Sequence, residues 1–469
     1  MEREAIRRAR LAGRELGADL GIEAQLRPYE AYRWQPGNQA QPTLQLDDVS
    51  AIPFLADIAG VEEYQHRGRL RAGDHDVYVT VTPAIDGYEA YCRNVLQLGT
   101  PEHLIADPAG LPIYVARACA QGRTRTRLAQ IAKDASGMTI HPYMGIEDVW
   151  ELAATLSVDS RSEVRVVAPP PPVTWIANDK AVFSELVERV LGRDFLVDTR
   201  IARDPVTIES DLRTLAQQYP RVGLKRTRCA SAMGNAVFSA PQVQTKRDAS
   251  RAVERFLRRT EWPEGEDVLS VAWIETDLSP STQLWIPPLG SGQPRLDGIY
   301  EQILEGDHKV FVGSRPSGLP STVNEALATS ALLVGSALQE LGYVGRCSFD
   351  HLVTGDPKGD FRALLTECNG RWGGTSTPMS LLDRMLQGPR PPYRAQDVVF
   401  PSLVGARLPD LLALVDDLLF RAESKQGRFV FYNLGPLAKH GKLDVISIGA
   451  DQSDAERGVL DLLARRLGL

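Results

Sequence analysis

Four residues late in the chain have the types and spacing of a site that could handle a metal ion and phosphate groups. Asp350 stands alone, whereas Glu367, Asn369 and Arg371 follow one another at intervals of two. Two carboxylates and a carboxamide offer hard oxygen ligands of the kind that Mg²⁺ prefers, and nucleotide phosphates can complete its shell. The set therefore predicts a magnesium site made by Asp350, Glu367 and Asn369. Arg371 and the small-residue loop 373–376 follow, and the backbone of such a loop can approach an anion.

A β-hairpin would bring these residues together. The stretch 348–379 begins as a strand, turns at 355–360 and returns as a second strand. Residues two apart on a strand share a face. A hairpin folded symmetrically about Lys358 and Gly359 would set the two carboxylates opposite each other, with Cβ atoms about 5 Å apart. Taken singly, an acidic residue at a strand end is usually solvated, and two facing acids repel without a cation.

This pattern resembles the metal-binding end of the ATP-grasp ligases, where an acidic residue on one strand precedes Glu-x-Asn-x-Arg on the next. The sequence of 366–376, TECNGRWGGTS, looks most like the pheganomycin-type peptide ligases. The resemblance is good over 171–387 and looser over the flanks. It implies an α/β chain (α+β in the catalytic part), in which a small parallel α/β pre-ATP-grasp domain precedes the ATP-grasp fold and a small α/β domain follows it.

Domain boundaries follow from the prolines. A length of 469 residues suggests about three domains. Alternating strand and helix patterns over 1–173 predict a small parallel α/β domain. The prolines at 169–172 fix an extended segment that cannot sit inside a helix or a central strand, so they mark its end. Further prolines after Gly388 separate a catalytic domain, 174–390, from a C-terminal α/β domain, 391–469.

Two lysines and a loop are candidates for holding a nucleotide. Lys180 lies in the first turn of a helix predicted over 179–191 with Asn178 as its cap, where a cation opposes the helix dipole. Lys225 ends a short strand, and the small-residue loop 229–235 follows it. N–H groups of such a loop can close over phosphates. An exposed lysine and an ordinary loop explain the same features when each is taken alone.

The resemblance assigns roles to residues of the nucleotide site. It implies that both lysines contact the nucleotide and that the loop covers its β- and γ-phosphates. It also implies that backbone groups after the strand 268–274 read the adenine edge, and that an acidic residue holds the ribose. For the ribose, Asp277 is slightly favoured over Glu275. The implied nucleotide contacts are Lys180, Lys225, Ser231, Gly234, Asn235, Ala272, Trp273, Ile274 and Asp277.

Three further predictions concern local structure. The Pro/Gln/Gly-rich stretch 33–45 is expected to be mobile. Residues 287–321 are rich in Gly, Pro and Ser and predict an irregular segment that borders the acceptor site. Arg295 and Arg315 within it are candidates for holding a substrate carboxylate, although solvated arginines explain them equally simply. Thr322 and Glu325 have the spacing of a capping box, which predicts a helix from there to about residue 341.

Composition limits the function classes. The net charge of −7 argues against a nucleic-acid or anionic-membrane partner, and 43% hydrophobic with 24% charged residues is ordinary for a soluble globular protein. No metal-ligand spacing links the five cysteines, and the seven histidines are scattered. Reduced thiols in a cytoplasmic protein are therefore expected. The first residues are charged and no apolar run is long enough to span a bilayer, so neither a signal peptide nor a membrane helix is predicted.

The function implied by the resemblance is ATP-dependent, ADP-forming ligation of a carboxylate to an amine or peptide through an acyl phosphate, in antibiotic or other natural-product biosynthesis. Glu367, Arg371 and Lys225 would be catalytic, and ATP with Mg²⁺, or Mn²⁺ in its place, would be required. Two alternatives stay open: loading of an amino acid onto a carrier-protein thiol, and a nucleotide-binding protein without turnover. The donor and acceptor, a homodimeric state and the role of the C-terminal domain are not decided by the sequence.

Overall fold

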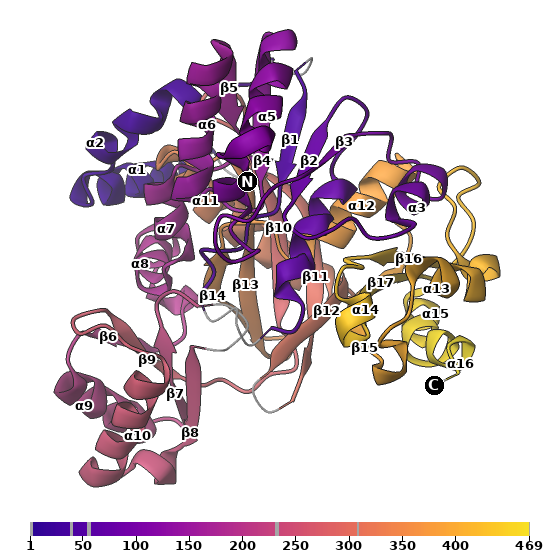
Figure 1. Cartoon of the computed structure of the whole chain (residues 1–469). Helices are drawn as coiled ribbons and strands as arrows, with labels where there is room; N and C mark the ends of the chain where they lie inside the picture. Colours follow the sequence, from indigo (N-terminus) through magenta and orange to yellow (C-terminus); the bar gives the residue numbers. More distant parts are fainter. Residues whose placement is uncertain (1–2, 38–40, 54–57, 230–233, 307–308, 469) are drawn as a thin grey trace.

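Three β-sheets organise the chain (Figure 1). The structure is a computed structural model that describes residues 3–37, 41–53, 58–229, 234–306 and 309–468. A parallel sheet lies near the N-terminus, a small antiparallel sheet in the middle of the chain, and a large antiparallel sheet is formed by the second half. Within the described residues, no helix combines the length and apolar character needed to cross a membrane.

The parallel sheet has five strands, and helices pack on its apolar faces. Its spatial order, β3-β2-β1-β4-β5, reverses direction between β1 and β4, so loops following those two strands meet at one edge. Ligands in open α/β sheets bind in the crevice at such a switch point. The elements are β1 (Thr43–Leu46), β2 (Val77–Thr80), β3 (Glu102–Ile105), β4 (Gly137–Pro142), β5 (Glu163–Val166), α3 (Tyr88–Asn94), α4 (Val115–Cys119), α5 (Gly122–Asp134) and α6 (Glu147–Ser160).

The prediction of a mobile stretch over 33–45 was wrong at its end, because Thr43–Leu46 forms β1, the middle strand of this sheet. Its sequence TLQL has only two apolar residues, and neighbouring strands on both sides supply the burial that its own pattern does not announce. Ile113 and Tyr114 lead into helix α4.

The small sheet has four antiparallel strands in the order β6-β9-β7-β8 and stands apart at the lower left of Figure 1. Two helices pack on one face of it and share an apolar core with its strands. This unit carries Lys225. The elements are β6 (Thr199–Ala202), β7 (Arg221–Arg226), β8 (Asn235–Ser239), β9 (Val268–Ala272), α9 (Pro205–Ala216) and α10 (Lys246–Arg259).

The large sheet has eight strands and carries the predicted hairpin at one edge. All the pairings within it are antiparallel. The strands, in spatial order, are β14 (Phe361–Asn369), β13 (Gly345–Gly355), β10 (Pro280–Ile286), β11 (Arg295–Glu305), β12 (Val310–Pro316), β15 (Tyr393–Val399), β17 (Lys442–Ile448) and β16 (Phe429–Tyr432).

The prediction that 287–321 is irregular was wrong for most of its length, since it contains β11 and β12. Two of its glycines, Gly298 and Gly313, lie within these strands and pack closely. A Cβ on Gly313 would lie 2.3 Å from the carbonyl oxygen of Ala395, on the neighbouring strand β15. Glycine here permits close backbone approach within a strand, and sequence alone does not distinguish this from a turn.

The strands of segment 391–469 continue the large sheet and do not form a separate one, because β15 pairs with β12 at Gly313 and Ser314. Their core also includes side chains of α3 and of α12 (Ser376–Leu386). The division at residue 391 therefore stays a prediction. The helices of this segment are α13 (Leu408–Leu414), α14 (Leu437–His440), α15 (Gln452–Arg457), the π-helix η8 (Gly458–Leu463) and α16 (Ala464–Arg466).

A layer of helices packs behind the hairpin. The N-terminal helix lies against α11, where a Cβ on Gly13 would meet the carbonyl oxygen of Ala337 at 2.5 Å. Helix α11 begins at Ser321 after Pro320 with no side-chain cap, so the predicted Thr322–Glu325 capping box does not form. The helices are α1 (Arg3–Asp19), α2 (Ile22–Leu26), α7 (Pro171–Asn178), α8 (Lys180–Leu191) and α11 (Ser321–Glu340).

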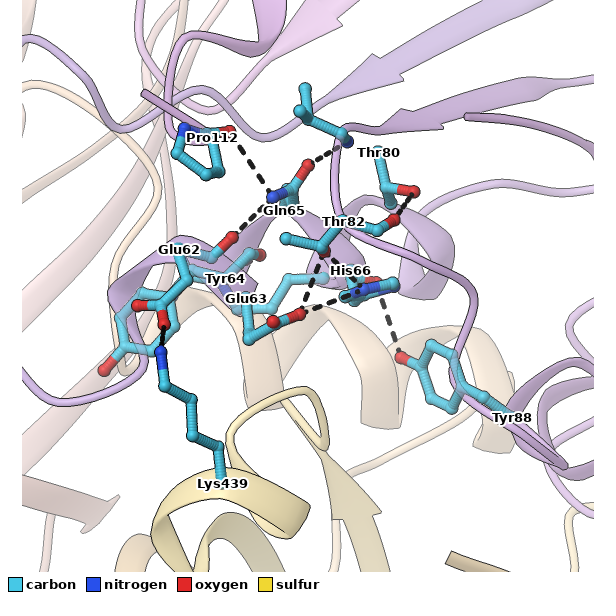
Figure 2. Close-up of polar contacts among 12 residues, drawn as sticks. Glu62, Glu63, Tyr64, Gln65, His66, Thr80, Thr82, Tyr88, Pro112 and Lys439 are labelled. Atoms are coloured by element: carbon cyan, nitrogen blue, oxygen red, sulfur yellow. Dashed lines mark hydrogen bonds and ion pairs between the residues drawn. The ribbon is translucent and has the colours of Figure 1, made fainter. Parts of the chain in front are cut away.

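The 3-10 helix η3 (Val61–Leu70) joins the parallel sheet to the C-terminal segment, and Figure 2 shows its polar contacts. Glu62 pairs with Lys439 of α14 at 2.6 Å. On its other side, His66 Nε2 lies 3.0 Å from Thr82 Oγ1, just beyond strand β2. Helix η3 therefore contacts the C-terminal segment through Glu62 and the parallel sheet through His66.

Candidate active site

Strands β13 and β14 form the predicted hairpin, and Asp350 pairs directly with Glu367. This confirms the predicted opposition of the two carboxylates. The hairpin is not symmetrical throughout, because the register shifts by one between Asp350 and His351. Thr366 is the extra residue of this bulge, and its hydroxyl donates to the carbonyl oxygen of Asp350 at 3.1 Å. Bulges of this kind often re-aim side chains beside active sites.

The three predicted metal ligands lie together on one face of the sheet. Asn369 Nδ2 donates to Asp350 Oδ2 at 3.0 Å, which leaves the amide oxygen of Asn369 available. Ser281 pairs with Asp350 on the other flanking strand, and its side chain hydrogen-bonds the Asp350 carboxylate. Among the described residues no group of three or more His, Cys, Asp and Glu could hold a metal, but the third ligand predicted here is an amide. Two opposed carboxylates and an amide oxygen fit Mg²⁺ by donor chemistry.

The surroundings of the two carboxylates shift their pKa values in opposite directions. Burial, followed by repulsion from Glu367, raises the pKa of Asp350 to about 7. Burial alone would also raise the pKa of Glu367, but Lys180 and Lys225 outweigh it and bring that pKa down to about 2. Glu367 is therefore ionised at neutral pH while Asp350 is poised to lose its proton. Strongly perturbed carboxylates of this kind cluster at functional sites.

Lys180 forms an ion pair with Glu367, as expected for a cation whose position in the first turn of a helix needs a compensating negative charge. Its Nζ lies 2.8 Å from Glu367 Oε2 and donates to the carbonyl oxygen of Cys229 at 3.2 Å. Burial alone would lower the pKa of Lys180, yet Glu367 and Cys229 hold it above its ordinary value. The carboxylate thus compensates for placing a cation in the first turn of a helix.

The predicted cap of this helix was wrong. Asp179, not Asn178, caps α8, and its carboxylate accepts from the N–H groups of Ala181 and Val182. Asn178 is instead the last residue of α7, and its side chain is engaged by the hairpin. The two prolines that begin α7 occupy its first turn, where a missing N–H costs nothing, so the proline run ends in a helix.

Arg371 lies where β14 ends, and its Nη1 donates to Asn178 Oδ1 at 2.7 Å. A small, partly open cleft lies beside it. Two loops at the switch point of the parallel sheet form one wall, and the hairpin end with α7 and the β7–β8 connection form the others. The lining residues are Ala51, Ile52, Pro53, Met144, Trp175, Asn178, Lys180, Arg228, Cys229, Glu367, Cys368, Asn369 and Arg371.

The structure thus brings Lys180, Glu367, Asn369 and Arg371 to one cleft. Asp350 and Lys225 do not line it, although both act electrostatically on Glu367. Burial, with repulsion from Lys180, lowers the pKa of Lys225, and its Nζ lies 5.3 Å from the centre of the Trp273 ring.

The remaining predicted nucleotide contacts are only partly placed. Ser231 lies outside the described residues. Asn235 pairs with Lys225 at the base of the β7–β8 connection, and the carbonyl oxygen of Gly234 accepts from the N–H of Arg226. These contacts close the base of the connection. The role of the loop over a nucleotide stays a prediction.

Two of the three predicted adenine contacts use their N–H groups elsewhere. Ala272 donates to the carbonyl oxygen of Asp198 at 2.8 Å, and Trp273 donates to that of Arg221 at 3.0 Å. Those two residues could offer adenine only their carbonyl groups, so Ile274 is left as the candidate N–H donor.

The choice of a ribose ligand stays open. Asp277 is 97% exposed and pairs with Lys309 at 3.3 Å, whereas Glu275 pairs with Arg221. Neither residue lines the cleft.

Both arginines proposed to hold a substrate carboxylate have acidic partners in the protein. Arg295 pairs with Asp297, and Arg315 bridges Glu301 and Glu456. Neither lines the cleft. The prediction had depended on an irregular loop that the structure replaces with strands.

Several lining residues were missed from the sequence. Arg228 packs over Trp175 with 5.1 Å to the ring centre and donates to Asp179, which places a half-exposed guanidinium beside Lys180. Residues 51–53 reach the cleft only because the unrecognised strand β1 delivers them there. The Asn-Asp-Lys sequence was the one available signal for Asn178, and it was interpreted as a cap.

No protein-family model matches the sequence, and no curated protein matches it. Solved structures do resemble the fold. An N5-carboxyaminoimidazole ribonucleotide synthetase in complex with ADP has a TM-score of 0.55 at 11% identity, covering 93% of this chain and 100% of that one. The Aspergillus clavatus synthase, bound to ADP and 5-aminoimidazole ribonucleotide, gives 0.52 at 13% identity, covering 92% and 100%.

A third similar structure is the dimeric biotin carboxylase domain of Hydrogenobacter thermophilus 2-oxoglutarate carboxylase, in complex with MgADP, ADP and bicarbonate. Its TM-score is 0.50 at 13% identity, covering 90% of this chain and 89% of that one. At such identities the likeness concerns the fold alone. Together with the parallel sheet, the small sheet and the hairpin, it shows that this chain has the ATP-grasp fold.

Proposed function

We propose that the chain is an ATP-dependent, ADP-forming carboxylate–amine ligase. The observation that carries the proposal is the opposition of Asp350 and Glu367 across one hairpin, with Asn369 on the same face and Lys180 paired to Glu367. A structural salt bridge explains the lysine and one acid but not the second acid or the amide. Similar structures are complexes with ADP and MgADP, which supports the same nucleotide chemistry here.

We assign a separate role to each group of residues in the site. Asp350, Glu367 and Asn369 would hold Mg²⁺, or Mn²⁺ in its place. When bound, the ion would neutralise charge on the β- and γ-phosphates of ATP. Lys180 and Lys225 would bind the phosphates electrostatically. Arg371 would stabilise the negative charge that develops as a substrate carboxylate takes up the γ-phosphoryl group and as an amine then attacks the acyl carbon.

The chemistry balances without a nucleophilic side chain. The carboxylate oxygen attacks the γ-phosphorus and ADP leaves, giving an acyl phosphate. The amine nitrogen then attacks the carbonyl carbon, and phosphate and a proton leave, giving an amide. The protein therefore has to position the substrates, exclude water and stabilise developing charge, and we assign these tasks to the residues of the cleft.

The finer proposal concerns substrates and organisation. We propose an amino acid or modified amino acid as the carboxylate donor and an amine or peptide as the acceptor, in natural-product biosynthesis. The division into 1–173, 174–390 and 391–469 and a homodimeric state belong to the same proposal. The dimer described for the biotin carboxylase domain is a reason to test the homodimeric state of this protein by analytical ultracentrifugation.

The experiment is an ADP-release screen over pairs of amino acids and peptides with Mg²⁺, followed by mass spectrometry of the products. Amide formation with one ADP per amide supports the proposal. Hydroxylamine replaces the acceptor in a parallel screen, because it traps an acyl phosphate as a hydroxamate.

The two alternatives predict different results in the same screen. A carrier-loading enzyme would turn over ATP only when a carrier protein is added. A nucleotide-binding protein without turnover would bind ATP yet release no ADP with any pair.

A further inference from the structure

The side-chain amide of Asn178 connects α7 to the end of the hairpin. Its Oδ1 accepts from the N–H of Gly370 at 3.1 Å and from Arg371 Nη1 at 2.7 Å. Its Nδ2 donates to the carbonyl oxygen of Thr174 at 2.8 Å and to that of Gly370 at 3.4 Å. The amide therefore uses both acceptor and both donor capacities, and only one of its two orientations satisfies all four contacts.

The contact with Gly370 is close enough to exclude a side chain there. A Cβ on Gly370 would lie 2.7 Å from Asn178 Nδ2 and 2.9 Å from the Ala177 Cβ. Gly370 stands between the predicted metal ligand Asn369 and Arg371. By binding both its N–H and its carbonyl group, Asn178 fixes the backbone that carries those two side chains.

The partner of Arg371 is neutral, which distinguishes it from Lys180 and Arg228, the other cations that line the cleft, since both of these pair with carboxylates. Lys180 pairs with a carboxylate, whereas Arg371 has no carboxylate oxygen within 4.0 Å among the residues that the structure describes. Asn178 Oδ1 holds the guanidinium by a hydrogen bond without cancelling its charge. An arginine with a full positive charge stabilises developing negative charge better than one already paired with an acid.

We propose that Asn178 is a positioning residue that aims Arg371 into the cleft without pairing it with an acid. This rests on the proposed function, because it acts through the role given there to Arg371. It goes beyond that role by assigning a residue whose neutrality, and not only its shape, matters for the reaction. Aspartate retains an acceptor oxygen for Arg371 but, like alanine, loses the two donor contacts to Thr174 and Gly370, so the comparison of these two variants tests the added charge.

The test compares Asn178→Ser, Asn178→Ala and Asn178→Asp by kcat, by KM for ATP and by melting temperature. The predicted order of kcat is wild type, then Ser, then Ala, then Asp, with Ala at least about tenfold below wild type. KM for ATP should change less than kcat. The Asp and Ala variants carry the test, and an Asp variant with a kcat at or above that of the Ala variant would overturn the proposal.

A second measurement repeats the substitutions in an Arg371→Ala background. If Asn178 acts through Arg371, they should have little further effect there, whereas a merely structural role would lower kcat by the same factor in both backgrounds. The Arg371→Ala protein also separates this inference from the proposed function. If it is fully active, the proposed site is wrong. If it is inactive while all Asn178 variants retain full activity, only the positioning role is wrong.

Discussion

At the scale of single residues, Glu367 has the largest number of predicted tasks, since it faces Asp350, pairs with Lys180 and lines the cleft. Glu367→Gln removes the charge but retains the shape. We expect the ligation rate to fall at least about a hundredfold, as is typical when a group that stabilises developing charge is lost. Steady-state ADP release measures the rate.

The control for Glu367→Gln is Lys358→Gln on the exposed turn of the same hairpin, which should leave the rate unchanged. Arg371→Ala should lose activity to a similar extent as Glu367→Gln. Full activity in both cleft variants would contradict the assignment of the site.

The pKa of Asp350, about 7 against an ordinary 3.8, predicts how Mg²⁺ binding depends on pH. Because the folded-state pKa is raised, ionisation of Asp350 destabilises the metal-free protein as pH rises toward 7. At pH 6 a proton occupies Asp350 in most molecules, so the apparent Mg²⁺ affinity should be about tenfold lower than at pH 8. Mg²⁺ without nucleotide should therefore raise the melting temperature more at pH 8 than at pH 6.

Asp350→Asn should abolish that difference in the Mg²⁺ effect. Asp444, whose pKa burial and Asp397 also raise to about 7, changes the baseline stability in the same pH window. The comparison with and without Mg²⁺ at each pH isolates Asp350 from it. An equal Mg²⁺ shift at both pH values in the wild-type protein would show that Asp350 is not a ligand.

The residues of the site differed in how far the sequence could predict them. Glu367, Asn369 and Arg371 follow one another on a strand, so their common face follows from the strand period alone. Asn178, Arg228 and the loop 51–53 reach the cleft from distant parts of the chain. Only tertiary packing brings them together, and a single sequence contains no direct record of it.

At the scale of elements, the junction of α7 with the end of β14 is a close contact beside the site. Gly370→Ala would place a Cβ 2.7 Å from Asn178 Nδ2, so the end of β14 has to shift away from α7. We expect a destabilisation of about 1–3 kcal/mol, typical of overpacking, together with a loss of ligase activity. Chemical denaturation and ADP release measure the two effects.

Gly373→Ala is the matched control, because nothing lies within 4 Å of the Cβ it would add. It should leave the free energy of unfolding close to that of the wild type. Equal effects of the two substitutions would mean that the contact between α7 and the hairpin does not matter.

Helices and strands with a regular hydrophobic pattern could be predicted from the sequence, whereas strands that owe their burial to adjacent strands could not. The hairpin, the helix containing Lys180 and the strand containing Lys225 have regular patterns and strong turn signals. Strand β1 is short and only half apolar, and β11 with β12 contains glycines that resemble loop signals. The bulge at Thr366 was not predictable either, because an extra residue in one strand does not change the alternation of residues in its partner strand.

At the scale of the whole molecule, the large sheet continues from the hairpin edge into the C-terminal segment. Ending the chain after Gly388 would remove β15, β17 and β16 and expose the apolar side chains of α3 and α12 that pack on them. We expect the fragment 1–388 to be insoluble or to lack a cooperative thermal transition, because each large side chain left exposed forfeits about 1.5–3 kcal/mol. Expression tests and calorimetry check this.

Co-expression of the segment 389–469 should restore a soluble complex if the missing core is the cause. A soluble fragment 1–388 that unfolds cooperatively would instead show that the C-terminal segment is a separable domain, as the prolines in the sequence indicate.

The central claim is that ATP gives its γ-phosphoryl group to a substrate carboxylate at the Asp350–Glu367 site. Once the screen has found a donor, that donor labelled with ¹⁸O in its carboxylate tests the claim directly. We predict that the released phosphate carries one ¹⁸O by mass spectrometry and that Glu367→Gln produces almost none. Unlabelled phosphate, or label found in AMP, would contradict acyl-phosphate formation at this site.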